Sequence, residues 1–171
     1  METWDAIRSR RNVRSYADTP IPDEHLGRIL EAGRRSPSSK NWQPWDFILV
    51  TDRQQLIELA KVWQYAGYLA RSAATIALIA PVQRAEVDRL ILQYDHGQAT
   101  MSMMLAAADL GIGTGHTAVG DQDLARTILG FPADRFCTYL IPLGYPADRP
   151  LTPIEHPARR PFDEVVHRGR W

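Results

Sequence analysis

Apolar positions along this chain recur in two patterns, one typical of helices and one typical of strands. The clearest helical stripe repeats at the i, i+3, i+4 and i+7 positions of one face, through Leu26, Ile29, Leu30 and Gly33. The longest helical segment runs from residue 86 to residue 110, and apolar or small side chains lie on most faces of its second half. We expect this helix to be buried widely, in a large core or against a partner subunit, because small side chains let helices approach closely.

Short continuous apolar runs predict three buried strands, at residues 47–50, 75–80 and 139–144. Shorter helices are expected at residues 5–10, 52–65 and 123–129. Asp52 and Gln55 would form a capping box at the start of the second of these, and Gly130 a C-cap at the end of the third. Because helices and strands mix without strict βαβ alternation, the pattern favours an α+β fold over a doubly wound sheet.

Composition and charge narrow the class of protein. A chain of 171 residues, 44% of them hydrophobic, suits a single domain over residues 1–171 with a full core. Acidic and basic residues balance at 20 each, which gives no reason to expect nucleic acid or a membrane as partner. The N-terminal residues lack the apolar region of a signal peptide, and no apolar run approaches membrane-spanning length. The lone Cys137 should be a buried thiol, so we expect a soluble cytoplasmic protein.

The segment from residue 146 to residue 171 differs from the rest of the chain. It holds five prolines, then a short helical pattern at residues 162–166, and it ends on Trp171. Such a tail should be extended, yet it is too apolar to be simply solvated. We expect it to pack on another surface, such as that of a neighbouring chain.

The loop at residues 36–45, SPSSKNWQPW, places serines, two carboxamides and two indoles between a helix and a strand. Its hydroxyl, amide and backbone N–H groups suit the polar edge of a flat heteroaromatic ligand, and its prolines limit the entropy lost on ordering. A helix-to-strand loop with buried tryptophans would explain the same residues. The residues by themselves leave both interpretations open.

Two clusters of arginines suggest that the chain binds an anion. Four arginines fall within seven positions near the N-terminus, at Arg8, Arg10, Arg11 and Arg14. Guanidiniums this close repel one another unless a bound anion or nearby carboxylates neutralise their charge. Their forked N–H donors suit phosphate oxygens. A solvated basic patch is the plainer alternative, and contact with nucleic acid is weakened by the neutral total charge. Arg159 and Arg160 recur in the tail, and one phosphate shared by both clusters would explain how the tail is held.

Other chemistries have less support. Residues 111–117, GIGTGHT, follow a helix and lack the third glycine of a dinucleotide fingerprint, so they indicate close backbone approach or a helix C-cap and turn. The histidines show no paired-ligand spacing, and no metal site is expected. No serine-hydrolase elbow and no P-loop occurs. Asp95 and His96 fall inside the long helix, where a structural polar pair is a better explanation than a catalytic dyad.

Five segments of the chain, in this order, resemble motifs of the nitroreductase family of flavoenzymes: residues 10–16 (RRNVRSY), 37–45 (PSSKNWQPW), 110–114 (LGIGT), 142–146 (PLGYP) and 159–161 (RRP). Each motif is weak by itself, but together they are specific and span nearly the whole chain. The resemblance implies an α+β FMN-binding fold with a central, mostly antiparallel sheet flanked by helices. It also implies a homodimer with an extended C-terminal tail, in which two flavins lie at the subunit interface and parts of both chains line each site.

The resemblance further implies which residues bind the flavin. The phosphate, ribityl chain and pyrimidine edge would be bound by Arg10, Arg11, Arg14 and the tail residue Arg159. Asn12, where the family more often has serine, would add a hydrogen bond. One side of the ring would be lined by Pro37, Ser38, Ser39 and Asn41. The region near its reactive centre would be approached by His116, Thr117 and Ala118.

The activity implied by the resemblance is an FMN-dependent oxidoreductase. It would pass electrons from NADH or NADPH to an electron-poor acceptor such as a nitroaromatic or a quinone, by ping-pong hydride transfer. Because the cofactor supplies the redox chemistry, no side chain is named as catalytic. A flavin-binding or carrier protein without nicotinamide turnover is an alternative, as is a specialised flavin-dependent reductase or dehydrogenase. The chain has little length for an inserted lid, which suggests an open site.

Overall fold

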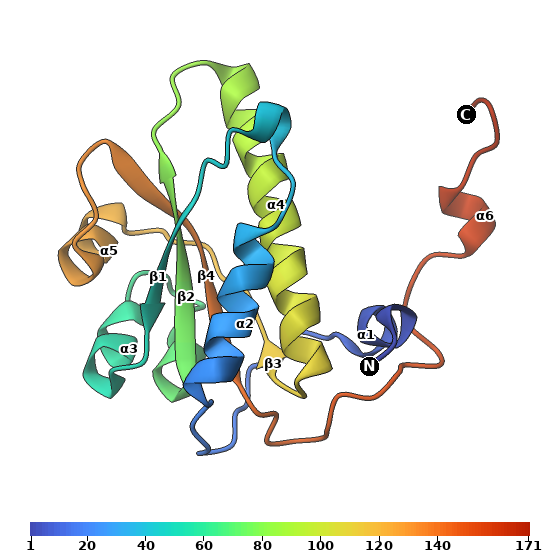
Figure 1. The fold of residues 1–171 in the computed structure, drawn as a ribbon, viewed down its shortest axis with the longest axis horizontal. Helices are drawn as coiled ribbons and strands as arrows, with labels where there is room; N and C mark the ends of the chain where they lie inside the picture. The colour runs from blue at the N-terminus through green and yellow to red at the C-terminus, as the bar shows by residue number, and fades with distance from the viewer.

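A computed structural model describes residues 1–171, and its centre is a four-stranded antiparallel sheet between two layers of helices (Figure 1). The strands are β1 (Asp46–Val50), β2 (Ala74–Pro81), β3 (Gly113–Thr114) and β4 (Arg135–Gly144). They lie in the order β1-β2-β4-β3, and each neighbouring pair is antiparallel. The expected α+β fold with a mostly antiparallel sheet is confirmed.

The helices cover both faces of this sheet, with α2 and α4 on one face and α3 and α5 on the other (Figure 1). Their bounds are α1 (Thr3–Ser9), α2 (Asp23–Arg34), α3 (Arg53–Leu59), α4 (Glu86–Asp109), α5 (Gln122–Leu129) and α6 (Phe162–Val165). Two short 3-10 turns, η1 (Ser39–Asn41) and η2 (Gly67–Arg71), lie in the connections that precede β1 and β2.

The core is divided by β2, whose side chains alternate between the two faces of the sheet. Ile76 and Leu78 pack into the cluster under α2 and α4, whereas Ala77 and Ile79 pack into the cluster under α3 and α5. All four are at most 2% exposed, so the strand is buried on both faces. A strand that is buried on both faces has a continuous apolar sequence, and the apolar run at residues 75–80 predicted this strand for that reason.

The helix expected at residues 52–65 is shorter than predicted, because α3 ends at Leu59. Beyond that point the carbonyl of Val62 accepts the backbone N–H groups of Gly120 and Asp121, at 3.0 and 2.9 Å, instead of continuing a helix. Only half of the expected capping box forms as well. Asp52 accepts the N–H of Gln55 at 2.8 Å, but the Gln55 side chain donates to the carbonyl of Ile128.

The third predicted strand is longer than expected and has a partner that the pattern did not reveal. β4 begins at Arg135 rather than at residue 139, since Phe136 and Cys137 pair with Ala80 and Ile79 beyond an irregularity in the register. Residues 113–114, predicted as part of a glycine-rich turn, form β3 against Gly144 and Leu143 of β4.

The C-terminal tail is extended, as predicted, and its first part is bound to the N-terminal segment. The backbone N–H of Ala147 donates to Ser15, and that of Ile154 donates to Arg8. The remainder leaves the body of the molecule, with α6 standing apart from the sheet (Figure 1). Phe162 is 66% exposed and Trp171 is 97% exposed, so this chain alone does not cover them.

The long helix α4 is less buried in its first half than in its second. Leu92, Ala99 and Met103 are at most 1% exposed, but Leu90 and Tyr94 are 60% and 72% exposed on its other side. In the second half, where wide burial was predicted, only Met101 is exposed, because α2, the sheet and the N-terminal segment with Val13 and Tyr16 pack against it. No helix of the structure is both long and apolar enough to cross a membrane.

Candidate functional site

The arginine-rich segment is fixed to the edge of the sheet by Val13. The backbone N–H of Val13 donates to the carbonyl of Thr114 on β3 at 2.8 Å, and its side chain is 1% exposed. This close approach depends on Gly113, because a Cβ at that position would lie 2.6 Å from Cγ2 of Val13. Val13 thereby orients the arginines on either side of it.

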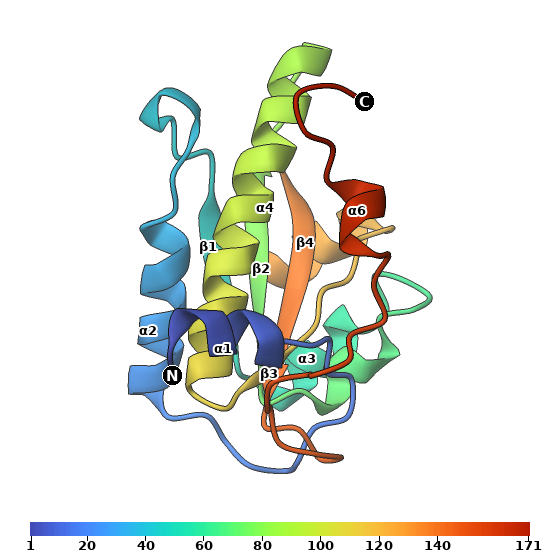
Figure 2. The same cartoon turned by 90° about the vertical axis from the view of Figure 1, so that its right-hand side faces the viewer.

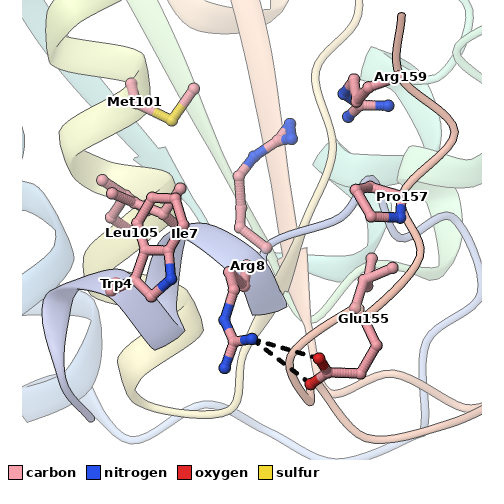
Figure 3. Close-up of a pocket in the computed structure, with 10 residues that line it drawn as sticks. Trp4, Ile7, Arg8, Met101, Leu105, Glu155, Pro157 and Arg159 are labelled. Atoms are coloured by element: carbon pink, nitrogen blue, oxygen red, sulfur yellow. Dashed lines mark hydrogen bonds and ion pairs between the residues drawn. The ribbon is translucent and has the colours of Figure 1, made fainter. Parts of the chain in front are cut away.

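Arg10 and Arg159, which are far apart in the sequence, line one open cavity of about 740 Å³, and Figure 3 labels Arg159 on its wall. Its other walls are Trp4, Ile7, Arg8, Met101, Leu105, Ile154, Glu155 and Pro157. Burial, and secondarily the charge of Arg159, lowers the pKa of Arg10. The Nε of Arg10 is buried without a hydrogen-bond partner. Three guanidiniums therefore line the cavity; Arg8 is paired with carboxylates, and those of Arg10 and Arg159 suit an anion such as a phosphate.

Arg8 and Arg11, on either side of Arg10, are paired with carboxylates of the same chain. Arg8 pairs with Asp5 at 3.0 Å and with Glu155 at 3.5 Å. Arg11 donates to Asp148 at 2.7 Å and to the carbonyl of Arg149 at 2.8 Å. The Arg11 side chain lines a separate small cavity along the tail, so in this chain it does not share the cavity of Arg10.

Asn12 and Arg14 lie on the open side of the same segment. Oδ1 of Asn12 accepts a hydrogen bond from Nη2 of Arg10 at 3.0 Å, which orients that guanidinium. The guanidinium carbon of Arg14 lies 5.6 Å from the centre of the Tyr68 ring, within the range of a cation–π contact. Arg14 therefore faces an aromatic wall, while Arg10 faces the cavity that also contains Arg159.

His116, Thr117 and Ala118 follow β3 and connect these two regions. Thr117 and Leu140 exchange backbone hydrogen bonds at 3.0 Å, which holds the turn against β4. His116 lines a groove together with Arg10, and a second cavity of about 530 Å³ together with Arg14. Burial, followed by the charges of Arg10 and Arg14, lowers the pKa of His116, so its ring is neutral near pH 7.

The loop at residues 36–45 lies near the opposite end of α4 from α1 (Figure 2). Pro37, Ser38 and Ser39 line a cavity with residues of the first half of α4, and none of its lining residues belongs to the cavity of Arg10 and Arg159. Asn41 is exposed on η1. The residues selected from the sequence thus form two separate groups within one chain.

Three aromatic residues beside Arg14 were not selected from the sequence. Trp63, Tyr65 and Tyr68 line the cavity of about 530 Å³, and the rings of Trp63 and Tyr65 meet edge to face with centres 5.9 Å apart. Trp63 and Tyr65 fall in the segment predicted as the end of the 52–65 helix, whereas α3 ends at Leu59. No group of three or more histidine, cysteine, aspartate or glutamate side chains is arranged to hold a metal ion.

Comparison with known proteins gives a consistent result over the whole chain. The model of the Nitroreductase family matches residues 7–67 and 61–145. A protein of Archaeoglobus fulgidus with the provisional name NADH dehydrogenase/NAD(P)H nitroreductase is 31% identical over 174 residues, which cover 99% of each chain. The FMN reductase (NAD(P)H) of Bacillus subtilis is 26% identical over 168 residues, 86% of this chain and 67% of its own. A crystal structure from Bacteroides thetaiotaomicron with the same provisional name as the archaeal protein is 26% identical, with a TM-score of 0.84, and the match covers 100% of this chain and 99% of that one.

Proposed function

Because this chain belongs to the nitroreductase family, we propose that it is an oxidoreductase that uses FMN to pass electrons from NADH or NADPH to an electron-poor small molecule. Nitroaromatics and quinones are the acceptor classes that we propose. The observation that carries the proposal is the convergence of Arg10 and Arg159 on one cavity.

The residues of this cavity fit the phosphate end of FMN. The unpaired Nε of Arg10 and the nearby charge of Arg159 both favour a bound dianion. On the far side of His116, Arg14 and three aromatic side chains would hold the polar edge of a flat ring and keep water from one part of it. When bound, FMN would take a hydride from the reduced nicotinamide and, after that donor has left, pass electrons to the acceptor that replaces it.

We propose that the working unit is a homodimer in which each site draws on both chains. Pro37, Ser38, Ser39 and Asn41 would then line the ring held by the arginines of the partner subunit. The exposed side of α4, with Leu90 and Tyr94, and the uncovered end of the tail support this arrangement, because an apolar surface of this kind is typical of an interface.

The test of the activity is the visible absorbance of the purified protein during anaerobic addition of NADPH and then NADH. Flavin bands that bleach with either donor, and return when a quinone or nitroaromatic is added, are the expected result. Flavin bands that persist with both donors would refute nicotinamide turnover and favour a carrier protein. A colourless protein that takes up no added FMN would refute the assignment of the cofactor.

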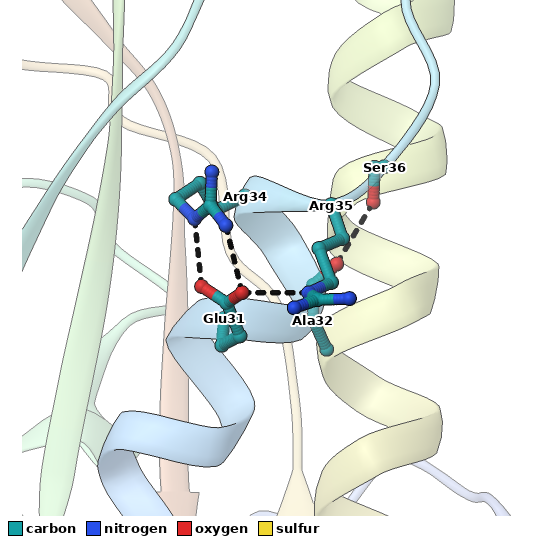
Figure 4. A network of polar contacts seen from close by, with 5 residues as sticks. All are labelled: Glu31, Ala32, Arg34, Arg35 and Ser36. Carbon is teal, nitrogen blue, oxygen red and sulfur yellow. Dashed lines mark hydrogen bonds and ion pairs between the residues drawn. The ribbon is translucent and has the colours of Figure 1, made fainter.

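A double substitution tests the shared phosphate site. Arg10→Ala with Arg159→Ala should raise the Kd for FMN at least about 100-fold, because each hydrogen bond to a charged group contributes about 1.5–3 kcal/mol. The matched control is Arg34→Ala with Arg35→Ala on α2, where both guanidiniums pair with Glu31 at the surface (Figure 4). Equal effects of the two double variants, or no effect of either, would contradict the site.

A further inference from the structure

The loop that carries Pro37, Ser38, Ser39 and Asn41 has a strained backbone. Lys40, Asn41 and Gln43 have φ values of 52°, 56° and 53°, and no other residue except glycine has a positive φ in this chain. This left-handed conformation is unfavourable for most residues with a Cβ, and although Asn41 tolerates it better than Lys40 and Gln43, three such residues fall within four positions. A loop of this kind keeps its shape only where the surrounding structure holds it.

Asp95 holds the first end of the loop. Its two carboxylate oxygens, on α4, accept the backbone N–H of Ser39 in η1, with N–O distances of 3.2 and 3.1 Å. Asp95 is 1% exposed, and its only other hydrogen-bond donor is the side chain of Gln98, at 3.4 Å. A buried carboxylate needs such donors, so the N–H of Ser39 and the carboxylate of Asp95 fix each other's position.

His96 holds the other end. Its Nε2 lies 2.9 Å from the carbonyl oxygen of Pro44, and since a carbonyl can only accept, Nε2 carries the hydrogen and donates it. Its Nδ1 lies 2.9 Å from Oγ1 of Thr138 on β4, which fixes the orientation of the ring. His96 is 2% exposed, and the Trp45 ring lies beside it, with ring centres 6.5 Å apart. Two adjacent residues of α4 thus bind the loop on both sides of its three strained residues.

We infer that Asp95 and His96 are positioning residues, which hold the loop from Ser39 to Pro44 in the one conformation that presents its serines and Asn41 to a ligand. That the ligand is FMN rests on the proposed function. The holding of the loop does not, because it is a property of the unliganded chain. The pair has no catalytic part in this inference, since both side chains are used by the loop and by β4.

Amide hydrogen exchange tests the holding of the loop directly. Asp95→Ala and His96→Leu should speed exchange in residues 38–45, at the Ser39 amide by about tenfold or more, as expected from losing a hydrogen bond to a charged group. Asp95→Asn keeps an oxygen acceptor and His96→Gln keeps an amide donor near Nε2, so both should exchange nearly as the wild type does. Ser102→Ala is the matched control on the same helix, because its hydroxyl bonds only to the carbonyl of Gln98 in α4.

The outcomes separate this inference from the proposed function. Faster exchange confined to residues 38–45, together with a higher Kd for FMN and a weaker visible circular dichroism of the bound flavin, would support both. Faster exchange in a protein whose wild type takes up no FMN would support the holding of the loop while the proposed function fails. Unchanged exchange in the two disruptive variants, or an increase spread equally along α4, would overturn the inference. If either disruptive variant does not fold, Asp95→Asn decides, because its neutral amide oxygen accepts more weakly than a carboxylate: a small increase of exchange confined to residues 38–45 would support the inference, and no increase there would overturn it.

Discussion

Gly113→Ala should destabilise the protein by disturbing the contact that anchors the arginine segment. The added Cβ would lie 2.6 Å from Cγ2 and 2.8 Å from Cβ of Val13, closer than real Cβ contacts allow. Val13 cannot turn away easily, since it is β-branched, 1% exposed and bonded through its N–H to Thr114. Overpacking of this kind typically costs about 1–3 kcal/mol, which corresponds to a fall in Tm of about 2–12 °C for a chain of this size.

Gly27→Ala provides the matched control, because it is the same substitution with the opposite expectation. Gly27 lies within α2, and a Cβ there meets no atom within 4 Å. Reduced entropy of the unfolded chain and better helix propensity should stabilise this variant by about 0.4–1 kcal/mol. Thermal unfolding by circular dichroism measures both changes. A neutral Gly113→Ala, or two variants that shift Tm in the same direction, would refute the reasoning.

Three further predictions concern single side chains. Burial lowers the pKa of His96, so below about pH 6.5 the unfolded chain binds a proton that the folded chain does not, and the free energy of unfolding should fall from pH 7 to pH 5. His96→Gln should reduce that fall. Denaturant titrations in which the free energies of unfolding of the variant and the wild type fall equally with pH would contradict this. Burial raises the pKa of the Cys137 thiol to about 12, so a disulfide reagent at pH 8 should label it only as fast as the protein unfolds, and rapid labelling of the native protein would be inconsistent with this burial. Asp121→Ala removes the acceptor for the N–H of Leu124 at the start of α5 and should cost about 1 kcal/mol in urea unfolding, an effect that Asp121→Asn should largely avoid.

The parts of the fold that local pattern determines could be predicted from the sequence. The stripe through Leu26 and Ile29 predicted α2, and Gly130, with a φ of 73°, ends α5 as expected. The parts that were missed depend on distant segments. β3 consists of two residues and exists only because Gly144 and Leu143 pair with it, and α3 ends where residues 120–121 bind the carbonyl of Val62.

The same division applies to the candidate site. Clustered guanidiniums need an anion or carboxylates, and that rule could be stated from composition. The path of the tail decides whether a carboxylate or a bound anion neutralises a given arginine. The tail brings Asp148 to Arg11, and it brings Arg159 to the cavity of Arg10. The aromatic residues beside Arg14 were missed because nothing local distinguishes Trp63 from a core residue.

The separation of the candidate ligand-binding residues into two groups, the loop at residues 36–45 and the arginines, has a consequence for mixed assemblies. If each site joins the arginines of one chain to the loop of the other, a chain without Arg10 and Arg159 still has an intact loop, and a chain with a damaged loop still has intact arginines. Each variant alone would be inactive. A heterodimer of the two variants would contain one doubly defective site and one intact site. Unfolding the two inactive proteins and refolding them together should therefore restore activity, by intragenic complementation.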